Sequence, residues 1–132
     1  MKTDDVGGRG GVKELKVWQK SYSLCLRIYE VTKIYPIEEK YGLSSQLRRA
    51  GISVPSNIAE GYGRKSTKQY IHQLYVSYGS ICEIETQLLL SRDLLYIGEE
   101  TFGEINSCLL GVERMLRALI NSLEKKLKRE ID

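Results

Sequence analysis

The chain has 132 residues, of which 42% are hydrophobic and 28% charged, and its formal net charge is +3. This length and balance fit one globular domain with a core of ordinary size, and they argue against a disordered chain. The mildly basic charge permits an anionic partner without requiring one. No apolar run approaches the ~20 residues of a membrane-spanning helix, so we expect a cytoplasmic protein without a membrane partner.

Residues 1–12 are polar and rich in glycine, and we expect them to form a flexible leader ahead of a helical domain at residues 13–125. Their GGRGG run resembles one unit of an RNA-binding arginine–glycine repeat, although a single unit fits a plain linker better. Residues 126–132 follow the domain as a charged tail, and we expect that tail to fray.

The first predicted helix runs from about Val12 to Tyr35. Apolar and aromatic residues recur there at three- and four-residue steps, which places them on one face of a helix. Pro36 ends this helix because a proline disfavours helical backbone in the residue before it. The residues of the apolar face are Leu15, Trp18, Tyr22, Cys25 and Tyr29.

The second predicted helix starts between Glu38 and Leu43 and reaches about Gly63, where glycine closes it. Pro55 lies inside it and removes one backbone hydrogen bond, so we expect a kink at that point. The apolar stripe of this helix consists of Leu43, Leu47, Ala50, Val54, Ile58 and Gly61. Beside it runs a polar stripe of Gln46, Arg49, Ser53, Asn57 and Glu60.

Two capping boxes are predicted to open the third and fourth helices, because each pairs a hydroxyl with a Glu or Gln three residues later. Ser66 and Gln69 start the third helix, which we expect to continue to about Ile97. Thr101 and Glu104 start the fourth helix, whose apolar residues follow a heptad-like seam typical of antiparallel bundles. The seam consists of Phe102, Ile105, Leu109, Val112, Leu116, Leu119 and Leu123.

These four amphipathic segments are joined by short turns. Such a pattern predicts an all-α fold, an antiparallel up-down-up-down four-helix bundle. The kink at Pro55 would then bend the second helix within the bundle.

Residues that carry catalytic or metal chemistry are sparse. His72 is the only histidine, and its place one turn into the third helix favours a surface or interface role. No Glu-x-x-His pair of a di-iron bundle occurs. The three cysteines, Cys25, Cys82 and Cys108, lie far apart and form no CxxC pair. We therefore expect buried, reduced thiols, no metal, no cofactor and no enzymatic activity.

Charge is distributed unevenly along the chain. Residues 43–70 hold five cations and one carboxylate, whereas residues 71–104 hold six carboxylates and one cation. A basic turn at residues 64–68, flanked by Tyr62 and Tyr70, would grip phosphates and stack on unpaired bases. The same polarity also suits head-to-tail association of identical subunits, or a solvated charge run. The residues that we predict to contact phosphates are Arg48, Arg49, Arg64, Lys65 and Lys68.

The polar stripe of the second helix has a counterpart in the third helix. If the two stripes face each other, Arg48 or Arg49 would neutralise Glu60 or Glu83, with Asn57 as a bridge. A buried polar network costs desolvation but fixes one register among several apolar alternatives. We therefore predict that this network specifies the packing of the two helices, or of two subunits. Its members are Gln46, Ser53, Asn57, Glu60, Ser80, Glu83 and Gln87.

Three stretches carry a family likeness: LKVWQKSYSL, YPIEEKYGLSSQLRRAGISVPSNIAEGYGR and GSICEIETQL. Together they resemble the four-helix bundle family of intervening-sequence proteins, whose members are encoded in insertions within bacterial large-subunit ribosomal RNA genes. The likeness covers about residues 12–125, and SVPSNIAEG with QLRRA upstream is its most specific part. The matching motif positions are Gln46, Arg48, Arg49, Ser53, Pro55, Asn57, Glu60, Gly61, Ser80, Glu83 and Gln87.

The resemblance implies a four-helix subunit that assembles into a barrel-like homopentamer. It also implies kinship with the accessory variability determinant of diversity-generating retroelements, a basic pentamer that contacts a reverse transcriptase and binds nucleic acid. No catalytic residues are established for the family. This chain departs from those strongly basic relatives in its modest net charge and its acidic third helix.

The residues and the resemblance together favour one function. We expect a non-enzymatic, homopentameric scaffold that binds RNA or DNA as an accessory to a reverse transcriptase. The alternative is a protein–protein interaction module without nucleic-acid binding, in which the same charges dock subunits and partners.

Overall fold

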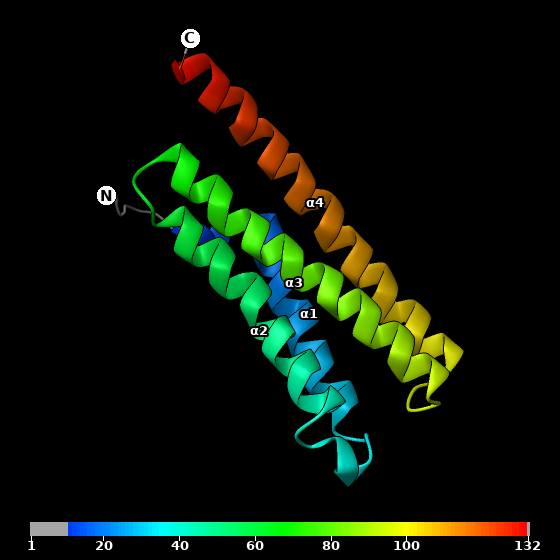
Figure 1. The fold of residues 1–132 in the computed structure, drawn as a ribbon. Helices are drawn as coiled ribbons and strands as arrows, with labels where there is room; N and C mark the ends of the chain where they lie inside the picture. Colours follow the sequence, from blue (N-terminus) through cyan, green and yellow to red (C-terminus); the bar gives the residue numbers. More distant parts are fainter. Residues whose placement is uncertain (1–10, 132) are drawn as a thin grey trace.

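The computed structural model describes residues 11–131, and this part of the chain contains four α-helices, two 3-10 helices and no strand. The 3-10 helices are η1 (Gly11–Glu14) and η2 (Ile37–Glu39). The α-helices are α1 (Lys16–Thr32), α2 (Leu43–Tyr62), α3 (Thr67–Asp93) and α4 (Glu99–Ile131). The expected all-α, four-helix fold is confirmed (Figure 1).

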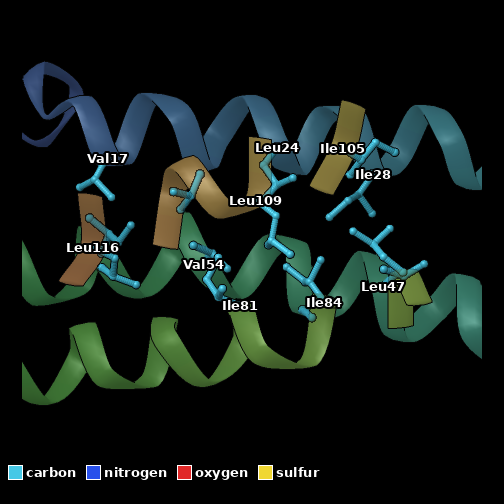
Figure 2. Close-up of a cluster of buried hydrophobic side chains, with 14 of the residues drawn as sticks. Val17, Leu24, Ile28, Leu47, Val54, Ile81, Ile84, Ile105, Leu109 and Leu116 are labelled. Carbon is cyan, nitrogen blue, oxygen red and sulfur yellow. The ribbon is translucent and has the colours of Figure 1, made fainter. Parts of the chain in front are cut away.

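The four helices enclose one hydrophobic core. α2 packs against α1 and α3, and α4 packs against the other sides of α1 and α3. Figure 2 shows Leu24 and Ile28 meeting side chains from the other helices, among them Ile105 and Leu109. Burying each such side chain stabilises the fold by roughly 1.5–3 kcal/mol. The apolar stripes predicted for α2 and α4 supply most of their buried residues. The stripe predicted for the first helix is wrong: α1 buries Leu24 and Ile28 instead, and Tyr22 is 49% exposed.

Several helix boundaries differ from the sequence prediction. The first helix is interrupted at Leu15, which separates η1 from α1, so residues 11 and 12 of the expected leader belong to a 3-10 turn. The remainder of that leader lies outside the described residues. α3 ends at Asp93 rather than Ile97, because Leu95 adopts a left-handed φ of 65° and the Tyr96 N–H donates back to the Ser91 carbonyl.

α4 starts before the predicted capping box and ends after the predicted domain. Glu99 is its first residue and Phe102 N–H bonds to the Gly98 carbonyl, so Thr101 lies inside the helix and the second capping box is wrong. The first box is confirmed at its hydroxyl, since Ser66 Oγ accepts from Gln69 N–H at 3.1 Å. The last buried residue of α4 is Ile120, but the helix continues through the charged tail to Ile131.

Pro55 lies within α2, buried, and the helix continues on both sides of it from Leu43 to Tyr62. The bend expected at Pro55 stays a prediction. Within residues 11–131, none of the helices combines the length and the apolar character that crossing a bilayer requires.

Candidate nucleic-acid interface

The five cations predicted to contact phosphates lie in two groups. Arg48 and Arg49 belong to the second turn of α2, near its connection to α1. Arg64 and Lys65 lie in the α2–α3 connection, and Lys68 lies in the first turn of α3. The rise of α2 from Arg49 to its end at Tyr62 is ~20 Å at about 1.5 Å per residue. The two connections are at opposite ends of α2, so the cations form two separate surfaces (Figure 1).

The α2–α3 turn offers two unpaired cations. Arg64 forms an ion pair with Glu60 one helical turn earlier, which neutralises part of its charge. Lys65 and Lys68 are exposed and form no ion pair within residues 11–131. This turn can therefore contact phosphates chiefly through its two lysines.

The two tyrosines beside this turn do not act alike. Tyr70 packs against the core and meets Tyr62 edge-to-face at 6.2 Å between ring centroids. Burial raises the pKa of the Tyr70 hydroxyl to about 12, with a smaller contribution from Tyr62. Tyr70 is thus a packing residue, and only the ring of Tyr62 remains exposed to solvent.

The other cationic surface is an open groove of about 610 Å³ between the end of α1, η2 and the start of α2. Its volume is in the range of small-ligand sites. All charged residues that line it are cations: Lys33, Lys40, Arg48 and Arg49. Three tyrosines line the same groove: Tyr29, Tyr35 and Tyr41. The sequence prediction missed Lys33, Lys40 and the three rings, although Lys40–Tyr41 adjoins the predicted start of the second helix.

Arg48 is held in the groove by contacts with α1. Its Nε donates to Thr32 Oγ1 at 2.8 Å and its Nη2 donates to the Tyr29 carbonyl at 3.3 Å. Its guanidinium carbon also lies 4.7 Å from the centroid of the Tyr29 ring, within the range of a cation–π contact. These three contacts fix a positive charge in place before any ligand binds. The expected pairing of Arg48 with Glu60 or Glu83 is therefore wrong.

Glu39, one of the carboxylates that adjoin the groove in sequence, is engaged elsewhere. Glu39 Oε1 accepts from Leu43 N–H at 2.8 Å, and its Oε2 accepts from the Tyr96 hydroxyl at 2.8 Å. These two hydrogen bonds, the backbone one foremost, lower the pKa of Glu39. Glu39 thus caps α2 as a carboxylate. The first turn of α2, which supplies Ser44 and Ser45 to the groove, adds the positive end of the helix dipole.

The structure brings together part of the predicted polar network. Ser80 Oγ of α3 donates to Ser53 Oγ of α2 at 2.7 Å. Asn57 Nδ2 donates to the Ser53 carbonyl at 2.8 Å and to Ser53 Oγ at 2.9 Å, so its hydrogen bonds stay within α2 and it does not bridge to α3. Ser77, which the prediction missed, donates to the Val54 carbonyl at 2.9 Å.

The remaining members of the network lie apart from this cluster. Gln46, Glu60 and Glu83 are exposed. Gln87 is half-buried, and its side-chain oxygen is buried without a hydrogen-bond partner among residues 11–131. The polar stripes of α2 and α3 extend beyond the line along which the two helices are in contact. Only the residues nearest that line therefore meet.

The hydrogen bond between Ser53 and Ser80 can be weighed by a double-mutant cycle. We expect Ser53→Ala, Ser80→Ala and the double variant to give a coupling free energy of about 0.5–1.5 kcal/mol in urea unfolding. Ser53→Ala combined with Ser107→Ala, an exposed serine of α4, is the matched control and should be additive. A coupling of zero between Ser53 and Ser80 would contradict the link between the helices.

A second groove on the outer face of α1 and α2 is apolar. It measures about 370 Å³ and is lined by Trp18, Tyr22, Cys25, Leu26, Ile52, Pro55, Ser56 and Ala59. Tyr22, Leu26 and Ile52 are 49%, 58% and 45% exposed. Ile52 also lines the cationic groove, so the two grooves adjoin along α2. These exposed apolar side chains lie beside one another and make this face a candidate surface for protein–protein contact.

The packed helices and their surface grooves define the chain as a small helical-bundle protein. The protein belongs to the family of 23S rRNA-intervening sequence proteins, whose family model matches residues 13–118. The resemblance seen in the sequence is thereby confirmed.

A solved structure supports the same assignment. The chain is similar to a protein of unknown function from the S23 ribosomal protein family of Bacteroides thetaiotaomicron VPI-5482, with a TM-score of 0.74 and 25% sequence identity. The similarity covers 80% of this chain and 95% of that one. None of the curated proteins matches this chain.

Proposed function

We propose that the protein is a non-enzymatic, homo-oligomeric scaffold that binds RNA. The observation that carries this proposal is the groove at the α1–α2 end, because its charged lining residues are all cations and tyrosine rings lie among them. Cations neutralise phosphates and aromatic rings accept stacked bases, which is the usual combination in proteins that bind nucleic acid. The lysines of the α2–α3 turn supply a second contact for phosphates.

Self-association is the second part of the proposal. The apolar groove along α1 and α2 supports it, since Tyr22, Leu26 and Ile52 would lose solvent contact against another subunit. The family resemblance implies five subunits. An oligomer would also bring several copies of each cationic surface to one RNA, which raises affinity by raising the local concentration of binding sites.

The lysines of the turn can be tested through salt dependence. We expect Lys65→Gln combined with Lys68→Gln to reduce the slope of log affinity against log salt by about 1.4 for single-stranded RNA, at roughly 0.7 for each phosphate contact. The reduction follows because each lost contact releases one counterion fewer. Filter binding at several salt concentrations measures the slope.

A matched control separates local contact from net charge. Arg114→Gln combined with Arg117→Gln removes the same charge from exposed positions of α4 and should leave the slope nearly unchanged. Equal effects of the two double variants would show that only net charge matters. Absence of RNA binding by the unmodified protein at low salt would instead favour a protein–protein interaction module.

A further inference from the structure

We infer that the cationic groove at the α1–α2 end binds an unpaired nucleotide, with the base stacked on Tyr41 and the phosphate held by Arg49 and Lys33. This inference rests on the proposed RNA binding and adds to it the class of RNA and the place where its base lies. Of the residues in this groove, the sequence pattern indicated only Arg48 and Arg49 as phosphate contacts, and the family assignment names none.

The groove holds one cation that is fixed by neighbouring groups and three cations that are exposed and unpaired within residues 11–131. Arg48 is fixed by Thr32 and Tyr29, and its recorded hydrogen bonds use Nε and Nη2. Lys33, Lys40 and Arg49 are exposed and form no ion pair within residues 11–131. Long cationic side chains without a carboxylate partner can close on a phosphate without first breaking an ion pair.

An aromatic ring lies open beside these cations. Tyr41 is 85% exposed, and the Lys40 ammonium lies 5.4 Å from the centroid of its ring. Ile37, on the same rim, is 79% exposed. An exposed aromatic ring and an exposed apolar side chain next to cations match a ligand that has a flat apolar part and an anionic part. A nucleotide has both properties, since its base stacks and its phosphate carries charge.

Single-stranded RNA fits this site better than a duplex. In a duplex the faces of the bases are stacked on one another and are not available to a protein ring. An unpaired base exposes a face, and stacking on a tyrosine is tolerant of sequence. The groove should therefore prefer unpaired RNA and show little preference among bases.

The test measures the affinity of a labelled 12-nucleotide single-stranded RNA by fluorescence anisotropy. Tyr41→Ala should weaken binding roughly ten-fold, which is the effect of losing one stacked base. Tyr41→Phe should bind as the unmodified protein does, because the ring is kept. Because Tyr41 is 85% exposed, its replacement leaves the fold intact, and thermal unfolding checks this.

A matched tyrosine serves as the control. Tyr75 of α3 is 49% exposed and donates to Glu124 of α4, far from the groove lining, so Tyr75→Ala should keep full affinity. Light scattering should give the same mass for the Tyr41→Ala and unmodified proteins, so that loss of affinity is not loss of assembly. Binding of a blunt duplex should not change with Tyr41→Ala.

The outcomes separate this inference from the proposed function. If the unmodified protein binds RNA and Tyr41→Ala binds equally well, the groove inference is overturned while RNA binding stands. If Tyr41→Phe loses as much affinity as Tyr41→Ala, stacking is likewise excluded as the role of Tyr41. If the unmodified protein binds no RNA at low salt, both the proposed function and the groove inference fail.

Discussion

Under the proposed self-association through the α1–α2 face, replacing Ile52 with glutamate is expected to give monomers of 15.1 kDa. Ile52 is 45% exposed in the isolated chain and lines both grooves of the α1–α2 face. In a packed interface its replacement would bury an unpaired carboxylate, which costs several kcal/mol. Size-exclusion chromatography with light scattering measures the mass.

Val76→Glu is the matched control for this change. Val76 lies on α3, is 40% exposed and does not line the apolar groove, so the same substitution there should leave the oligomer intact. If both variants keep the mass of the unmodified protein, the α1–α2 face is not the interface. An unmodified protein that is itself a monomer would refute self-association altogether.

Replacing Gly61 with alanine is expected to lower the free energy of unfolding by about 1–3 kcal/mol, as overpacking of a close contact does. A Cβ at Gly61 would lie 2.9 Å from Gln73 Cβ, 2.9 Å from Tyr70 Cδ1 and 3.2 Å from the Tyr70 carbonyl oxygen. Two of these atoms belong to or adjoin the α3 backbone, so the helices themselves would have to separate. Urea unfolding followed by circular dichroism measures the change.

Gly79→Ala, on the neighbouring helix α3, is expected to raise stability where Gly61→Ala lowers it. A Cβ at Gly79 meets no atom within 4 Å, so the alanine keeps its helix propensity and should stabilise the protein by up to about 1 kcal/mol. A Gly61→Ala variant that is as stable as Gly79→Ala would show that α2 and α3 are not in close contact at that point.

The fold could be predicted largely because apolar spacing reports it directly. The seam of α4, with Ile105, Leu109, Val112 and Leu116, is buried as the spacing predicted. The ends of the helices were harder to predict, because they depend on single residues. α3 ends where Leu95 takes a left-handed conformation, which a leucine rarely adopts. Thr101 and Glu104 have the spacing of a capping box, but they lie inside α4, which already starts at Glu99.

The candidate site could be predicted only in part. Which groups a side chain contacts depends on the direction in which it points from the helix as well as on its position along the helix. Arg48 and Arg49 are consecutive, so their side chains point ~100° apart. Arg48 consequently turns to α1 and bonds Thr32, whereas Arg49 stays exposed. Lys33 and Tyr41 join them because the chain folds back through η2. Pro36 predicted the end of the first helix, but no pattern indicated that the turn brings these two side chains to Arg48 and Arg49. The hydrogen bond between Ser53 and Ser80 could be predicted, because both serines lie on the polar stripes that were expected to face each other.

The most direct test of the central claim is the affinity of the unmodified protein for single-stranded RNA across a range of salt concentrations. If the two ends of α2 hold phosphates, log affinity should fall linearly with log salt, with a slope of about 0.7 for each phosphate contact. Affinity that does not change with salt, or no binding even at 50 mM salt (a low ionic strength at which surface electrostatics are strongest), would contradict the account.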